Sequence, residues 1–271
     1  MIFIVKIFTY LIIYSFIGWL YESTLCSISA KKIINRGFLN GPICPIYGFG
    51  AIAVILVFYQ RVENIGILFL GSMLLTSVVE YITSFLLEKI FHTKWWDYSN
   101  RHFNIKGRIF LLGAVVFGAF SVLAIKFIHP LIERIVNLIP EWVLVSSSIL
   151  ILVILLIDLY ITTRYLFKLN NRLEEIQIAF NYYKEQYLKR TKEFKGAVFE
   201  KLEKSEFYNE RIEKLLNWKP KQGKRLARAF PGLKPQKVND IWQKLKTRLL
   251  SNNKNGKKKV KGCSDVYGVE E

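Results

Sequence analysis

Three acidic residues lie within long apolar stretches of the chain, where a charged side chain is expensive. They are Glu22, Glu80 and Asp158, and an ionised acid inside a membrane-spanning helix costs about 2.5–3.5 kcal/mol on insertion scales. The acids either line a polar cavity open to one side of a membrane, or form interhelical hydrogen bonds and ion pairs with Arg36 and Arg108. Glu80 lies deepest and has no base near it in the sequence, which favours a functional role for this residue.

The segment from residue 35 to residue 50 combines glycines and prolines with apolar side chains. Proline lacks an N–H donor and glycine permits unusual backbone angles, and such backbone cannot face lipid because its polar groups would stay unsatisfied. We expect the segment to be buried in protein or to line a wet cavity as a re-entrant turn, with freed amides able to hold an anion. A tight loop before a helix is the simpler alternative. The candidate residues are Asn35, Arg36, Gly37, Gly41, Pro42, Pro45, Tyr47 and Gly48.

A second polar segment, residues 93–108, is rich in tryptophan and tyrosine, which favour the membrane interface. Asp97 lies between Trp96 and Tyr98, where a simple aromatic anchor needs no acid. It could pair with Arg36 or Arg108 and lock the two segments together. The polar candidates near this segment are Glu88, Asp97, Asn104 and Arg108.

No motif for metal binding or covalent catalysis stands out in the sequence. The two histidines that flank Asp97 do not have a metal-binding spacing, and the three widely spaced cysteines make no metal or redox motif. No nucleophile–base pair is evident. We therefore expect no catalytic residues, no metal and no cofactor.

The elements that position these residues are predicted to be membrane-spanning helices, because a span needs about 20 mostly apolar residues. The first stretch lacks a basic n-region and a small-x-small cleavage site, so it is expected to be retained as a helix. The predicted fold class is all-α: a polytopic membrane helical bundle with a long, helical, basic cytoplasmic tail. About five stretches qualify, of which the second is the weakest: Ile2–Tyr21, Ile43–Gln60, Ile65–Leu87, Ile109–Ile128 and Val143–Phe167.

The charge is distributed unevenly along the chain. Residues 1–163 hold 12 Lys or Arg and 8 Asp or Glu, whereas residues 164–271 hold 27 and 13. An apolar first part therefore carries a strongly basic second part, which excludes one uniform soluble domain. The more basic linkers follow the first and third stretches, and the tail is basic throughout. By the positive-inside rule the N-terminus is predicted outside and the tail in the cytoplasm of a multi-pass cell-membrane protein.

The two polar segments resemble those of a known bacterial family. The first carries Asn35-Arg36-Gly37-Phe38-Leu39, Gly41-Pro42 and Pro45-Ile46-Tyr47-Gly48, and the second carries Trp96-Asp97-Tyr98-Ser99, Phe103-Asn104 and Gly107-Arg108. With the preceding Gly18-Trp19 and Glu22, these motifs resemble the CmpB-type "putative ABC-transporter type IV" family over roughly residues 1–165. The resemblance implies a transport permease, and it supplies no catalytic residues.

Four parts are predicted: a transmembrane domain at 1–165, an amphipathic segment at 166–218, basic short helices at 219–250 and a disordered tail at 251–271. In the amphipathic segment, apolar residues recur at alternating spacings of three and four: Leu166, Leu169, Leu173, Ile176, Phe180, Tyr183 and Tyr187. Such a stripe is typical of a coiled coil, and so of a homodimer, but a single helix packed on its own protein explains it nearly as well.

Two short basic helices are expected after the amphipathic segment. The first is bracketed by Pro220 and Pro231, and the second covers Val238–Leu250. Their charge and apolar sides suit anionic lipid headgroups. The tail has no recognisable RNA-binding module, so a nucleic-acid partner is not expected.

Three functions remain open. The first is a transporter permease subunit with a polar site on its cytoplasmic side; it would need a separate ATPase and a second copy of this chain, because the sequence contains no Walker A pattern. The second is a membrane-embedded enzyme acting on lipid headgroups, with Glu22, Glu80 or Asp97 as acid or base and Arg36 or Arg108 holding phosphate. The third is a non-catalytic scaffold or sensor that works through the tail.

Overall fold

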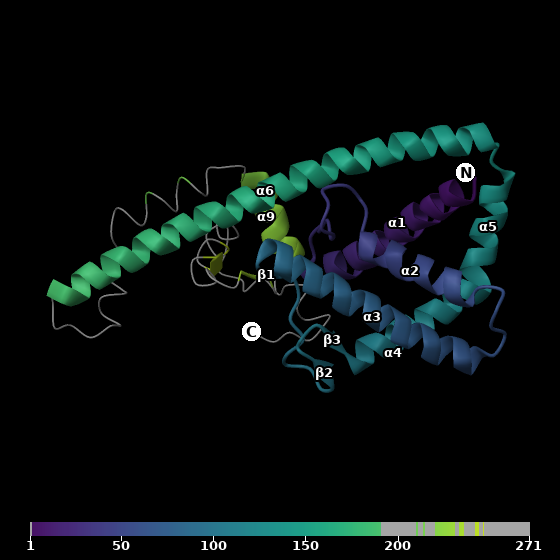
Figure 1. Cartoon of the computed structure of the whole chain (residues 1–271), viewed down its shortest axis with the longest axis horizontal. Helices are drawn as coiled ribbons and strands as arrows, with labels where there is room; N and C mark the ends of the chain where they lie inside the picture. The colour runs from purple at the N-terminus through teal and green to yellow at the C-terminus, as the bar shows by residue number, and fades with distance from the viewer. Residues whose placement is uncertain are drawn as a thin grey trace.

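A computed structural model describes residues 2–190, 220–230 and 233–235, together with the single positions 210, 214, 242, 243 and 246. The described chain is almost entirely helical (Figure 1), which confirms the predicted all-α class. The helices are α1 (Ile2–Ala30), α2 (Pro45–Phe58), α3 (Ile65–Phe91), α4 (Leu111–Leu123), the π-helix η1 (Ala124–Ile128), α5 (His129–Leu138), α6 (Glu141–Arg190) and α9 (Pro220–Ala229). Two short antiparallel pairs join β1 (Thr93–Lys94) to β4 (Lys234–Pro235), and β2 (Asn104–Ile105) to β3 (Ile109–Phe110).

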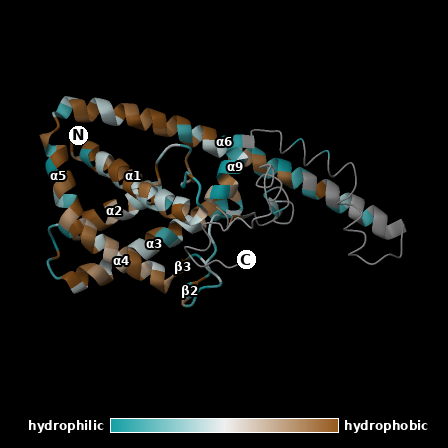
Figure 2. Cartoon of the chain, turned by 180° about the vertical axis from the view of Figure 1, so that it is seen from behind, coloured by the Kyte–Doolittle hydropathy of each residue, from teal (hydrophilic) through white to brown (hydrophobic). Residues whose placement is uncertain are grey.

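Four helical stretches are long and apolar enough to cross a membrane. They are Ile2–Ala30, Ile65–Phe91, Leu111–Leu138 and Glu141–Glu175. Large apolar side chains cover their outer faces, as at Ile149, Leu150 and Ile154 of α6, each more than half exposed in the isolated chain. The helices of the bundle are largely brown, the colour of hydrophobic residues, in Figure 2. A water-exposed surface of this kind would be strongly unfavourable, whereas lipid matches it.

The predicted second span, residues 43–60, forms a shorter helix than expected. Helix α2 has 14 residues, which at 1.5 Å each reach only about 21 Å. The chain before it, residues 31–44 (linker 1), is not helical, and several of its side chains are buried: Ile34, Leu39 and Cys44. Linker 1 is therefore covered by protein, as its glycines and prolines predicted, while the number of membrane crossings stays a prediction.

Glycines let α1 and α2 approach closely. A Cβ added at Gly48 would lie 2.4 Å from the Leu11 carbonyl oxygen and 2.2 Å from Ser15 Oγ, and one at Gly18 would lie 2.2 Å from Tyr47 Cγ. Each helix thus presents a glycine to the other helix. No side chain larger than hydrogen fits at either position unless the helices separate.

We expect Gly48→Ala to lower the free energy of unfolding in detergent by about 1–3 kcal/mol, because the added methyl group meets helix backbone that cannot turn away. Gly50→Ala is the matched control, since nothing lies within 4 Å of its added Cβ. Alanine at position 50 should be neutral or stabilising by up to about 1 kcal/mol. Equal melting temperatures for the two variants would contradict the close approach of α1 and α2.

A π-helical turn interrupts the fourth apolar stretch. η1 covers Ala124–Ile128 and is followed by His129 and Pro130 at the start of α5. Pro130 has no N–H to donate and its ring clashes with the carbonyl four residues earlier, so the widened turn accommodates it. Beyond η1, α5 runs across the end of the bundle where the N-terminus lies (Figure 1).

Linker 1, residues 92–110 (linker 2) and α9 all lie at the opposite end of the bundle, which we call the loop end (Figure 1). Helix α6 continues past this end, and Leu166, Leu169 and Leu173 are buried there in one cluster with residues of α9 and α3. The first three residues of the predicted coiled-coil stripe therefore pack on their own chain. The side chains of Ile176, Phe180, Tyr183 and Tyr187 lie outside the described residues, as do the segments 191–209 and 251–271.

Candidate functional site

Asp158 of α6 holds linker 1 in place. Its Oδ1 accepts hydrogen bonds from the Asn40 backbone N (3.1 Å), Asn40 Nδ2 (2.8 Å) and Thr162 Oγ1 (3.1 Å), and its Oδ2 accepts one from the Gly41 backbone N (2.8 Å). A carboxylate with four donors is well satisfied. Asp158 is thus a structural acceptor that ties linker 1 to α6, and it does not line the cavity described below.

Glu22 and Arg36 form an ion pair at the start of linker 1. Arg36 Nε lies 3.3 Å from Glu22 Oε2, and the Tyr47 hydroxyl donates to Glu22 Oε1 at 3.0 Å. The Arg36 backbone N donates to Ser23 Oγ at 3.1 Å. The predicted pairing of Arg36 with an acid is confirmed here, and these contacts join α1, linker 1 and α2.

The remaining candidates of linker 1 shape its backbone. Asn35 Oδ1 accepts a hydrogen bond from Trp19 Nε1 at 2.6 Å, and Asn35 Nδ2 donates to the Asn40 carbonyl at 2.8 Å. Gly37 has a φ of +115°, a conformation that glycine adopts readily and other residues rarely do. Pro45 begins α2, where its missing N–H is harmless, and Pro42 lies exposed in the turn before it.

The basic helix α9 closes over linker 1 from the far end of the sequence. Arg225 Nη1 donates to the carbonyls of Gly37 (3.1 Å) and Leu39 (2.9 Å), and Nη2 donates to that of Phe38 (3.3 Å). Burial lowers the pKa of the Arg225 guanidinium, while the nearby Asp158 carboxylate opposes this effect. One side chain of the tail thus satisfies three successive carbonyls of a loop almost 190 residues earlier.

We expect Arg225→Ala to release α9 from linker 1. Hydrogen bonds from a charged donor contribute about 1.5–3 kcal/mol, so amide hydrogen exchange in residues 220–230 should become about ten- to a hundredfold faster. Arg228→Ala is the matched control, because Arg228 is an exposed arginine on the same helix. If both variants exchange at the wild-type rate, Arg225 does not hold the helix.

Arg108 is the centre of the polar contacts between linker 2 and α3. Its Nη2 lies 2.5 Å from Glu88 Oε2, its Nη1 donates to the Tyr81 hydroxyl at 3.1 Å, and its carbonyl accepts a hydrogen bond from Trp96 Nε1. The hydrogen bond to Glu88 raises the pKa of the Arg108 guanidinium. This second arginine–acid pair also agrees with the prediction.

Asp97 and Asn104 act within linker 2. Asp97 Oδ1 accepts hydrogen bonds from the Ser99 backbone N (3.1 Å) and Ser99 Oγ (2.5 Å). Asn104 Oδ1 accepts from the Gly107 backbone N at 2.9 Å. Arg36 and Arg108 bind Glu22 and Glu88, and the expected pairing of Asp97 with either arginine stays a prediction.

Aromatic rings make a direct contact between the two linkers. Phe38 of linker 1 lies 5.1 Å from Trp95 of linker 2, measured between ring centroids, and 5.5 Å from Phe91. Phe230, just after α9, stacks edge-on against Trp95 at 4.8 Å, and the Arg36 guanidinium lies 5.1 Å from the Phe230 ring. The loop end is therefore one packed unit made of both linkers and α9.

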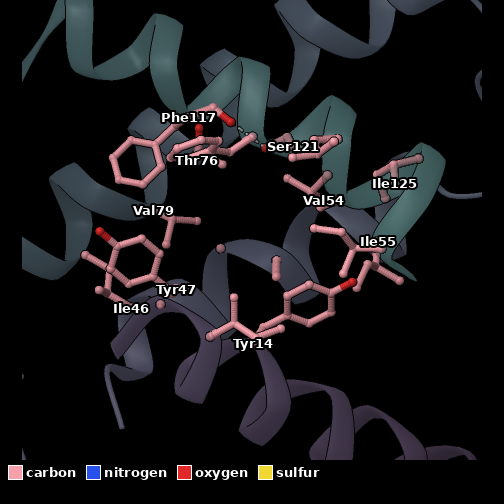
Figure 3. A pocket seen from close by; sticks show the side chains of 18 of the residues that line it. Tyr14, Ile46, Tyr47, Val54, Ile55, Thr76, Val79, Phe117, Ser121 and Ile125 are labelled. Atoms are coloured by element: carbon pink, nitrogen blue, oxygen red, sulfur yellow. Dashed lines mark hydrogen bonds between the residues drawn. The ribbon is translucent and has the colours of Figure 1, made fainter. Parts of the chain in front are cut away.

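Glu80 is buried in α3 and lies apart from these networks. Its side chain is 8% exposed and makes no hydrogen bond with any described residue. It lines a cavity of about 270 Å³ enclosed by α1, α2, α3, α4 and η1, shown from close by in Figure 3. Of the three acids Glu22, Glu80 and Asp158, only Glu80 lines this cavity. The sequence predicted a polar cavity, but the wall is mainly apolar.

Three functional positions were missed from the sequence. Asn40 makes two of the four contacts to Asp158, and a polar residue beside Gly41 in an apolar run was the available signal. Tyr14 contributes a buried hydroxyl without a hydrogen-bond partner to the cavity wall. Arg225 lies in a helix whose basic composition gave no indication of a protein partner.

Among the described residues, no group of three or more potential ligands could hold a metal ion.

Apolar helices of membrane-spanning length, with two arginine–acid pairs at the loop end, define a helical membrane protein. Residues 9–163 match the family described as "Putative ABC-transporter type IV". Because the match covers more than half of the 271 residues, the chain belongs to this family, as the motifs of the two linkers indicated. No curated protein and no solved structure matches the chain.

Proposed function

We propose that this chain is the multi-pass permease subunit of a transporter, with the cavity beside Glu80 on the route of its solute. The observation that carries this proposal is a buried acid that makes no hydrogen bond with the described residues and faces a cavity inside the membrane part of the chain. Ionisable residues at membrane depth are costly and usually mark a substrate or ion pathway. The π-helical turn η1 contributes to the same wall, and such turns are frequent at functional sites.

Membership of an ABC-transporter family supports a partner that supplies energy. The sequence has no Walker A pattern, so ATP hydrolysis would fall to a separate ATPase subunit. The proposed topology has the N-terminus outside and the loop end in the cytoplasm, because both basic linkers and α9 gather there. A cytoplasmic ATPase would then meet linker 2 and α9, and a second copy of the chain would complete the transporter.

The loop end also bears on two other expectations. The enzyme alternative needs an arginine to hold phosphate, and Arg36 and Arg108 are instead bound to Glu22 and Glu88. On α9, Leu226 and Phe230 are buried against protein, so contact with anionic lipid would rest on the exposed Lys221 and Arg228. Charge rather than an inserted apolar face would then attract this helix to a membrane.

A solute route must be reachable by water from at least one side of the membrane. In a cysteine-free background, Val79→Cys places a thiol on the cavity wall and Val78→Cys places one on the exposed face of α3. We expect a small water-soluble methanethiosulfonate reagent to label the variant at position 79 in reconstituted vesicles. The variant at position 78 should stay unlabelled because lipid keeps its thiol protonated. Protection at position 79 from both sides would overturn the transport proposal.

A further inference from the structure

The cavity wall is mainly apolar and aromatic, with a few hydroxyl groups and one acidic side chain. Tyr47 lies beside Phe117, with 5.8 Å between the ring centroids, and Tyr14 lies on another side of the cavity (Figure 3). The wall hydroxyls of Thr76 and Ser121 donate to the carbonyls of their own helices, to Ser72 and Phe117 respectively. Glu80 is therefore the one charged group of the wall among the described residues.

Unlike Glu22, Glu88 and Asp158, Glu80 has no positive or hydrogen-bonding partner among the described residues. Glu22 is bound to Arg36 and Tyr47, Glu88 to Arg108, and Asp158 to linker 1. Glu22 also acts on Glu80 electrostatically, as a like charge. A buried carboxylate without a counter-charge is strongly unfavourable, so Glu80 either takes up a proton or pairs with a positive charge that enters the cavity.

The described chain does not supply that charge, because no Lys, Arg or His lines the cavity. A metal ion would need several oxygen ligands, and the wall offers one carboxylate besides neutral tyrosine, threonine and serine hydroxyls, which are weak ligands. Among the described residues, no group of three or more acidic, histidine or cysteine side chains could hold a metal ion. An organic ammonium group needs fewer: one carboxylate and the faces of aromatic rings are sufficient to bind it in a desolvated site. The apolar remainder of such a molecule would match the rest of the wall.

We infer that the cavity binds a small lipophilic cation, an organic amine whose ammonium group pairs with Glu80 and whose apolar part packs against the rings of α1, α2 and α4. A volume of about 270 Å³ corresponds to roughly nine water molecules at 30 Å³ each. This suits a solute of about nine non-hydrogen atoms. The inference rests on the proposed transport function and names its substrate class.

Phenethylammonium and 2-phenylethanol test the inference, since they have the same number of non-hydrogen atoms and differ in charge. The full chain purified in detergent should bind phenethylammonium at least about tenfold more tightly than the alcohol. In Glu80→Gln the preference should disappear, whereas Glu80→Asp, which keeps the charge, should retain part of it. The control Glu141→Gln removes an exposed acid that lies outside the cavity wall and should leave the preference in place. Melting temperatures measured on the same preparations identify any variant that has lost its fold.

Equal binding of the two compounds by the wild type, or no binding of either, would overturn the inference. So would a preference that survives in a folded Glu80→Gln variant. The thiol-labelling experiment at positions 78 and 79 separates this result from the function itself. Labelling without cation binding would leave a transporter with another substrate, while cation binding without labelling would leave a ligand site that is not a route.

Discussion

Replacing Asp158 with asparagine is expected to lower the free energy of unfolding by about 3 kcal/mol and to loosen linker 1. The amide NH2 group replaces one carboxylate oxygen, so its hydrogens face either the Asn40 donors at Oδ1 or the Gly41 N–H at Oδ2. At least one buried donor then faces another donor, which costs about 1–3 kcal/mol, and the stronger hydrogen bonds to a charged acceptor are lost as well. Equilibrium unfolding in mixed micelles measures the first effect, and amide exchange in residues 35–44 measures the second.

Glu141→Gln is the matched control for this substitution, because Glu141 is an exposed acid at the start of the same helix. It makes the same chemical change away from linker 1 and should alter the stability by less than about 0.5 kcal/mol. Should Asp158→Asn prove as stable as the control, the four hydrogen bonds of Asp158 do not hold linker 1 to α6.

The second large effect is expected for Arg108→Ala. Glu88 would lose its hydrogen-bonded partner while its side chain stays only 12% exposed, and breaking a buried ion pair in this way costs about 3–5 kcal/mol. Loss of the hydrogen bond to Tyr81 and of the guanidinium contacts with the Tyr81 and Phe85 rings adds to the effect. Melting temperatures in detergent should show the destabilisation clearly.

A second substitution tests the cause. Glu88→Gln removes the stranded charge, so the double variant should recover part of the stability that Arg108→Ala loses. Lys89→Ala removes an exposed positive charge beside Glu88 and serves as the control for a general effect of charge at this end. A double variant no better than Arg108→Ala would show that packing of the arginine, rather than its charge, stabilises linker 2.

The sequence predicted the helices well because membrane spans are read from long apolar runs, and four of the five stretches correspond to helices of spanning length. It also predicted buried irregular backbone in linker 1, since Gly37, Gly41 and Pro45 lie close together among apolar residues. Pairing was harder. The structure shows Asp97 bound to Ser99 within its own turn, a local contact that short acidic side chains often make, while its pairing with an arginine stays a prediction.

Two features of the site could not be found by reading along the chain. The contact of Arg225 with linker 1 depends on how the tail folds back, and helical periodicity records only that Leu226 and Phe230 share a face. The apolar cavity beside Glu80 arises where α1, α2, α3, α4 and η1 leave space between them. Such a cavity cannot be predicted from the sequence, because each helix taken alone has an ordinary pattern of apolar side chains.

The reach of Arg225 back to linker 1 has a consequence for biogenesis. The chain is synthesised from its N-terminus, so the carbonyls of Gly37, Phe38 and Leu39 are made long before the guanidinium that binds them. The helices can enter the bilayer first, but the loop end acquires its native hydrogen bonds only after residue 225 has left the ribosome. A chain terminated before α9 would be inserted and yet immature, and such a product is a natural target for membrane quality control.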